Sequence, residues 1–333
     1  MKSQLAKFKK IKDKPLSDIL HILHLSEERL YTLCHMWIDQ GHLKKDDPIF
    51  TEIREYRQAR RQHSIQNRRE QELKAYQELR DADLTIGETA KRLRFSRVKM
   101  DHFFKKWYQI LSQQEQSDTE IAHILRVNTT HFENIRTEYE EEARLKLEAR
   151  ERRLSANRLY ADTHLAGIQE DLQRGTQRYL IFDIEAIQCP DEPIEISMID
   201  CHGNTVFNQL IKPENKINWR IEKLTGITND MVANQPNIHR VMPIIKELTQ
   251  GRTLLSWGSD YDAVLFKTAC EETGTDLKCT FGCAQRIHMG ILNSKNQIAL
   301  GTAAGTDTQS HRALDDCLLV LDILKRDIAL KGL

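Results

Sequence analysis

The chain has 333 residues, 40% of them hydrophobic, with 49 basic and 49 acidic side chains, so about two globular domains and no overall charge bias are expected. It contains no run of about 18 apolar residues, which excludes a transmembrane helix, and its basic N-terminal segment lacks the apolar stretch of a secretory signal. Seven cysteines in no regular framework indicate reduced thiols, and we therefore expect a cytoplasmic protein that does not bind membranes.

The balanced charge hides a difference between two parts of the chain. Residues 1–178 contain 34 Lys and Arg against 29 Asp and Glu, whereas residues 179–333 contain 15 against 20. The basic part could bind a polyanion, and some of the surplus acidic residues in the other part could be metal ligands. Solvated helix faces produce differences of this size too, so the charge split alone decides nothing.

The first part of the chain is predicted to be helical. Apolar residues recur there at spacings of three and four, between many Glu, Arg, Lys, Gln and Leu residues. We expect an all-helical region over residues 1–140 and a charged helical linker over residues 141–177. The charged stretches 52–80 and 133–158 are interpreted as exposed or bridging helices.

Three segments of the helical region look like copies of one unit. Residues 87–100 align with residues 119–132 at an offset of 32, and residues 17–30 form a looser copy at an offset of 70. Each copy predicts a short helix, a tight turn that closes on a capping Ser or Asn, and a second helix. This pattern resembles the helix-turn-helix of bacterial DNA-binding regulators.

The middle copy is the best candidate for contact with duplex DNA. Its second helix would carry cations that could reach phosphates or base edges, namely Arg97, Lys99, Lys105 and Lys106. Small helix-turn-helix units also serve as packing modules or protein-docking surfaces. A protein partner or a homodimer contact through this region therefore stays an alternative.

The pattern of residue types changes at about residue 178. Short β-branched or apolar runs between turn signals predict strands at residues 178–187, 194–200, 204–213 and 253–258. Helical periodicity covers residues 241–250, 262–274 and 312–330. Residues 178–333 are thus expected to form an α/β domain with a mixed central sheet and flanking helices.

Two acids lie two residues apart in the first predicted strand. Asp183 and Glu185 should share one face of that strand, opposite the apolar face formed by its neighbours Leu180, Phe182 and Ile184. Adjacent carboxylates on a largely buried strand repel each other unless a cation offsets the charge. Hard oxygen ligands favour Mg²⁺ or Mn²⁺. A strand end that points two acids into water is the alternative.

Three further candidates follow in the chain. Asp262 comes after a predicted strand and opens a helix, a place where open α/β sheets present functional groups. His311 and Asp316 are five residues apart, about 140° on a helix, and would not share a helical face. They can converge if Asp316 lies in the first turns of a helix and His311 in the preceding loop.

These segments together resemble a known family. FDIEAI, YDAVLF and HRALDD are similar to the three motifs of DEDDh (DnaQ-like) 3′→5′ exonucleases, and residues 222–236 resemble the segment between the first two motifs. The resemblance covers about residues 178–328 and implies a ribonuclease-H-like fold. Two departures concern the residues after Glu185 and the Trp257–Gly258 pair, where the family often has Thr-Thr-Gly and His-Asn.

The resemblance also implies roles for individual residues. Two Mg²⁺ or Mn²⁺ ions would be held by Asp183, Glu185, Asp262 and Asp316, and His311 would be the general base in the release of 5′-mononucleotides. The terminal bases would contact an apolar wedge, for which the candidates are Ala186, Ile187, Leu224 and Ile227. These apolar residues are equally good candidates for the core.

The substrate follows less directly from the sequence. We expect a metal-dependent 3′→5′ exonuclease acting on single-stranded nucleic acid, with DNA narrowly favoured because of the helix-turn-helix copies. A 3′→5′ exoribonuclease is one alternative, since the Ser-Trp-Gly segment at residues 256–258 resembles the histone-mRNA-type branch. Another is a nucleic-acid-binding or complex-assembly subunit whose nuclease domain acts only with a protein partner.

Overall fold

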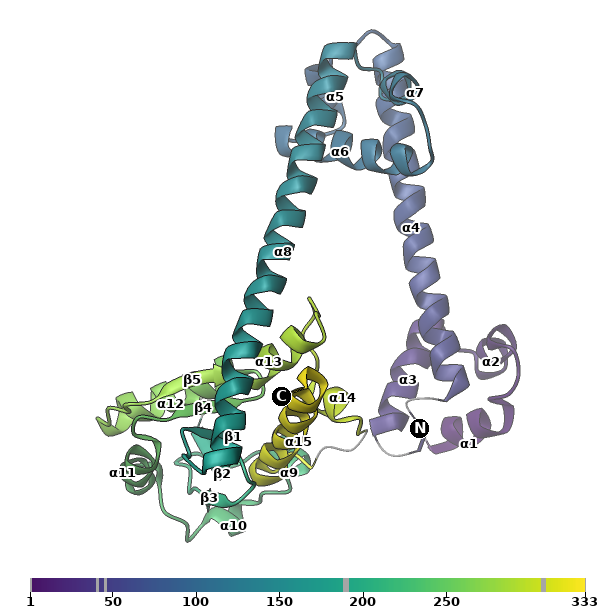
Figure 1. Cartoon of the computed structure of the whole chain (residues 1–333). Helices are drawn as coiled ribbons and strands as arrows, with labels where there is room; N and C mark the ends of the chain where they lie inside the picture. Colours follow the sequence, from purple (N-terminus) through teal and green to yellow (C-terminus); the bar gives the residue numbers. More distant parts are fainter. Residues whose placement is uncertain (1, 40–41, 45–46, 188–191, 307–309, 333) are drawn as a thin grey trace. The chain divides into compact units, whose positions relative to one another are not determined.

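The computed structural model describes residues 2–39, 42–44, 47–187, 192–306 and 310–332. The chain divides into two compact units, Met1–Glu142 and Ala143–Leu333 (Figure 1). Among the described helices, none combines the length and the apolar character that crossing a membrane requires.

The first unit is all-helical, as predicted. Its helices are α1 (Lys2–Ile11), α2 (Leu16–Leu23), α3 (Glu27–Asp39), α4 (Pro48–Asp81), α5 (Ile86–Arg92), α6 (Arg97–Gln113), α7 (Asp118–Ile124) and the beginning of α8 (Thr129–Arg174). Two cores form within this unit. One surrounds Trp37 between α1, α2, α3 and the start of α4, and the other surrounds Tyr76 between the end of α4, α5, α6, α7 and the start of α8.

The three sequence copies fold as the same local motif. Each copy turns at a residue in the left-handed conformation, with φ of 50°, 56° and 52° at His24, Arg94 and Arg126. The second helix of each copy then begins at a side-chain cap on a backbone N–H group, from Ser26, Ser96 and Asn128. The shared turn conformation explains why the copies align at offsets of 70 and 32.

The second unit contains the sheet. After the rest of α8 come β1 (Tyr179–Ile187), β2 (Glu192–Asp200), β3 (Thr205–Leu210), α9 (Trp219–Thr225), α10 (Asn229–Val232), α11 (Ile238–Thr249), β4 (Thr253–Ser256), α12 (Ser259–Thr273), β5 (Thr280–Cys283), α13 (Ala284–Ile291), α14 (Leu300–Ala304) and α15 (Ala313–Lys331). The strand β5 was not predicted from the sequence, because it has only four residues and one of them is a glycine.

The strands lie in the order β3-β2-β1-β4-β5, with β2 antiparallel to β1 and β3, and with β1, β4 and β5 parallel. One face of the sheet packs against α13, α15 and the end of α8, around Ile181 and Leu255. The other face packs against α11 and α12, around Phe182 and Met198. The predicted α/β fold with a mixed central sheet and flanking helices is confirmed.

The end of α8 contributes to the core of the second unit. Ala161, Leu165 and Ile168 are fully buried in the cluster that also contains residues of β1, α13 and α15. On α13, a Cβ atom at Gly290 would lie 2.3 Å from the backbone oxygen of Asn157, so the two helices touch through backbone. Residues 161–172, which fall in the stretch expected as a linker, are therefore part of this core.

Candidate active site

The pleat of β1 separates its acids from its apolar residues. Phe182 and Ile184 are buried in the core between the sheet and helices α11 and α12. Asp183 and Glu185 alternate with them and therefore lie on the same face of the strand as Ile181. Ile181 packs in the core beneath α15. The two carboxylates therefore share the face of the sheet that α15 covers.

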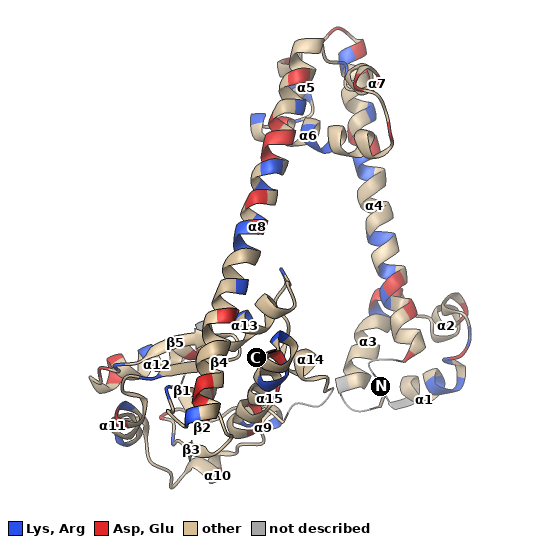
Figure 2. Ribbon diagram, viewed as in Figure 1, with Lys and Arg blue, Asp and Glu red and all other residues tan. Residues whose placement is uncertain are grey.

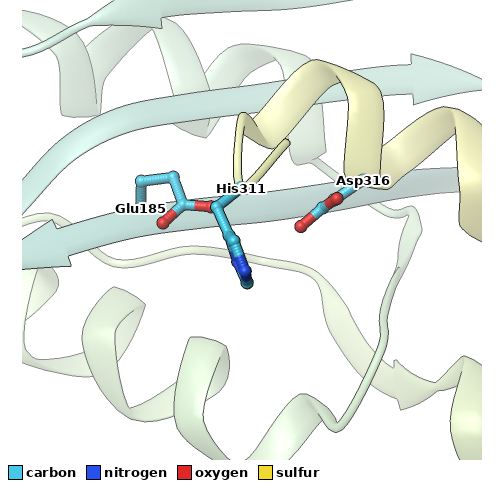
Figure 3. A group of neighbouring side chains, drawn as sticks. All are labelled: Glu185, His311 and Asp316. Atoms are coloured by element: carbon cyan, nitrogen blue, oxygen red, sulfur yellow. The ribbon is translucent and has the colours of Figure 1, made fainter. Parts of the chain in front are cut away.

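The start of α15 presents two more candidates to this face. His311 lies in the loop before the helix, with φ of 50°, and Asp316 lies in the first turn, where its backbone N–H donates to Arg312 O at 3.0 Å. Metal-ligating atoms of Glu185, His311 and Asp316 all lie within 4.8 Å of one another. Figure 3 shows these three side chains converging from the strand, the loop and the helix. The loop-to-helix arrangement thus brings His311 and Asp316 together.

An ion pair with a buried carboxylate fixes the loop that carries His311. Glu195 on β2, opposite Glu185 in the register, is 1% exposed. Its carboxylate accepts hydrogen bonds from Arg312 Nε at 3.0 and 3.2 Å, from Arg312 Nη2 at 2.5 Å and from the backbone N–H of Ala313 at 2.9 Å. His311 is the residue immediately before Arg312. The ion pair therefore anchors the backbone at the point where the chain enters α15.

Asp262 completes the group of acids. It lies in the first turns of α12 and is 6% exposed. Burial raises its pKa to about 6, against the lowering effect of the nearby Ser256 hydroxyl. Asp262 is also the neighbouring charge that most strongly raises the pKa of Asp183, which places the two carboxylates in one electrostatic cluster.

The cluster has a surplus of negative charge. Burial, and then the charges of Asp262, Glu185 and Asp316, raise the pKa of Asp183 well above its usual range. Burial, Asp316 and Glu195 raise the pKa of Glu185 to about 8, and Arg312 opposes them. Because Arg312 is already bound to Glu195, the other acids need further positive charge to ionise together. A set of oxygen ligands in this state fits a hard divalent cation.

The proposed wedge residues divide between core and surface. Ile187 and Ile227 are 3% and 0% exposed and pack with Ile221 of α9, whereas Leu224 is 49% exposed and Ala186 is half-buried. Sequence reasoning missed Trp219 at the start of α9, which is 68% exposed. Because Ile221 packs beside Ile187, α9 stands next to the end of β1 that carries Glu185. An exposed tryptophan there can stack on a base.

The cations expected on α6 differ in their surroundings. Lys105 Nζ lies 3.1 Å from Glu138 and 2.5 Å from Glu142, so its charge is largely offset within the unit. Lys99 lies 3.6 Å from Glu72 and 3.8 Å from the centre of the Phe95 ring. The remaining two are Arg97, which is exposed, and Lys106, whose Nζ donates to Gln109 at 2.9 Å.

Comparison with known proteins finds a family match over most of the second unit. Residues 180–324 match the family described as exonuclease. A bifunctional exonuclease/endonuclease protein of Mycobacterium tuberculosis is 29% identical in an alignment of 147 positions that covers 40% of this chain and 22% of the relative. The DNA polymerase III subunit epsilon of Aquifex aeolicus is 28% identical in an alignment of 168 positions that covers 47% of this chain and 82% of the relative.

Solved structures also resemble part of the chain. A full-length 3′-exonuclease is 20% identical, with a TM-score of 0.40, over 46% of this chain and 60% of that one. The chain spans only 22% of the length of the Mycobacterium relative. The sequence similarity therefore covers only a small part of that relative.

Proposed function

We propose, from the match of residues 180–324 to the exonuclease family, that the chain is a metal-dependent 3′→5′ exonuclease that shortens single-stranded DNA. The observation that carries the proposal is the convergence of Glu185, His311 and Asp316 within 4.8 Å. The DNA polymerase III relative supports DNA as the substrate. RNA is the alternative that the assay below distinguishes.

We assign the metal to the acids of the cluster. Asp183, Glu185, Asp262 and Asp316 would hold two Mg²⁺ or Mn²⁺ ions. When bound, these cations offset negative charge on the reacting phosphate and favour deprotonation of water. The raised pKa values of Asp183, Glu185 and Asp262 support this assignment, because each carboxylate ionises more readily when a cation offsets its neighbours.

His311 has the proton-transfer role in this proposal. Its imidazole lies beside Glu185 and Asp316 and is half-buried, so it can accept a proton from the attacking water without leaving the site. The anchored backbone at Arg312 limits the positions that the imidazole can take. Attack at the last phosphodiester would release a 5′-mononucleotide and leave a 3′-hydroxyl end.

The test uses 5′-labelled single-stranded DNA and RNA of one sequence, incubated side by side with Mg²⁺ or Mn²⁺. Stepwise shortening that a chelator stops is expected, faster on DNA. Asp316→Asn should abolish it. The neighbouring Asp315→Asn is the matched control and should retain activity, because Asp315 is exposed and accepts a hydrogen bond from the Ser310 hydroxyl at 2.8 Å. No shortening of either substrate by the pure chain would contradict the proposal.

A further inference from the structure

The middle of α4 is an exposed, strongly basic helix. Between the buried residues Ile53 and Tyr76, no side chain of this helix is buried. The segment contains Arg54, Arg57, Arg60, Arg61, Arg68 and Arg69. In Figure 2, the blue ribbon that marks Lys and Arg recurs along this part of the helix. A segment that packs against no core does not need this composition for folding.

Half of these arginines are not neutralised locally. Arg57 pairs with Glu28 at 3.6 Å, Arg60 pairs with Glu27, and Arg68 lies 3.7 Å from Glu72. Across the described parts of the chain, no ion-pair partner approaches Arg54, Arg61 or Arg69. Spacings of seven residues place Arg54, Arg61 and Arg68 on one side of the helix, about 10 Å apart. With Arg69, which follows Arg68 in the chain, they form a track of positive charge that runs from Arg54 to Arg69.

The track leads to a cavity between α4 and α6. The cavity has a volume of about 280 Å³, and its basic lining residues are Arg68, Arg69, Lys99, His102 and Lys106. Glu72 is the acid in the lining. Phe95, Phe103 and Trp107 also line it, and the last two are 5% and 6% exposed, so they form a fixed aromatic wall. Cations beside aromatic rings are the groups that bind phosphates and stack on bases.

We propose that this α4 track, Arg54 to Arg69, and the adjoining cavity bind a single strand of nucleic acid. Its phosphates would lie along the arginines, and one base would enter the cavity. An amphipathic acidic peptide fits less well, because Ile65, at 41% exposed, is the one large aliphatic side chain on the track. The choice of a nucleic acid among polyanions rests on the proposed function of the second unit.

The proposal changes the interpretation of two sequence features. The stretch 52–80, expected to be only an exposed or bridging helix, supplies most of the charge. Of the cations expected on α6, Lys99 and Lys106 line the cavity, whereas Lys105 lies against Glu138 and Glu142. Binding therefore depends on the face between α4 and α6 rather than on α6 alone.

The test measures binding without cleavage. The full chain carrying Asp183→Asn, in chelator, is titrated against a fluorescein-labelled single-stranded DNA 20-mer, and fluorescence anisotropy gives Kd at several salt concentrations. Adding Arg61→Glu, Arg68→Glu and Arg69→Glu should raise Kd at least about tenfold and reduce the salt slope by about two, as expected for three lost phosphate contacts. Circular dichroism checks that the exposed substitutions leave the helices intact.

The matched control makes the same change of charge in the second unit, with Lys246→Glu, Lys267→Glu and Lys295→Glu on exposed side chains. Its Kd should stay within about twofold of the parent. A Kd of the arginine variant within twofold of the parent would overturn the proposal. Displacement of the labelled DNA by polyglutamate as readily as by unlabelled DNA would overturn it too. If the wild-type chain binds DNA through these arginines but shortens no substrate, the proposed exonuclease activity is contradicted and the proposed binding site is supported.

Discussion

Replacing Glu195 with alanine tests whether the ion pair at the start of α15 positions His311. The substitution removes the acceptor of the Arg312 guanidinium and of the Ala313 backbone N–H. His311 is held at φ of 50°, which is costly for a residue with a Cβ. The loss of Glu195 removes the bonds that tie β2 to Arg312 and Ala313, and we expect the imidazole to move away from Glu185 and Asp316.

The magnitude follows from the burial of the two partners. Breaking a fully buried ion pair costs about 3–5 kcal/mol. The side chain of Glu195 is 2% exposed but that of Arg312 is 36% exposed, so the orphaned guanidinium can rehydrate. We therefore expect Glu195→Ala to lower the free energy of unfolding by about 1–3 kcal/mol. A displacement of about 1 Å in a catalytic group can lower kcat by about 100-fold.

The assay compares kcat and KM for mononucleotide release with the unfolding midpoint in urea. Glu192→Ala is the matched control, because Glu192 also lies on β2 and accepts bonds from a loop, the backbone N–H groups of Glu214 and Asn215. The control should change kcat by less than about twofold. A Glu195→Ala chain that is less stable but retains full kcat would refute the positioning argument and leave Glu195 a purely structural residue.

Three further outcomes are expected. The folded-state pKa values of Glu185 and Asp262, about 8 and about 6, exceed the ordinary values of 4.5 and 3.8, so the folded metal-free chain binds more protons than the unfolded one. Its unfolding temperature in chelator should therefore fall as pH rises from about 4 to 8, and Glu185→Gln should flatten the upper part of that fall; a flat profile in the parent would contradict the charge cluster. Trp219→Ala should raise KM for single strands by about 5-fold to 150-fold, which corresponds to about 1–3 kcal/mol for a lost stack, and Trp219→Phe should restore it; equal KM values for all three would exclude stacking. Gly290→Ala should destabilise the second unit by about 1–3 kcal/mol in urea unfolding, because its Cβ would meet the backbone of α8; an unchanged midpoint would show that this part of α8 is not fixed to the domain.

Period-two alternation was enough to predict part of the site. It placed Asp183 and Glu185 on one face of β1 and Phe182 on the other, and the structure has that division. The convergence of His311 and Asp316 required a loop before a helix, which the structure also has. Strands and turns are local, so these features could be predicted from a few neighbouring residues.

Features that depend on distant parts of the chain could not be predicted in this way. Glu195 meets Arg312 across 117 positions, and only the pairing of β2 with β1 and the packing of α15 on both bring the two together. One signal was visible in the sequence, since Glu195 interrupts an otherwise apolar strand and a buried acid needs a partner. The sequence could not show that this partner is the residue after His311. The same strand–helix contact that encloses the acids therefore also fixes the proposed base, and loss of that contact should affect stability and catalysis together.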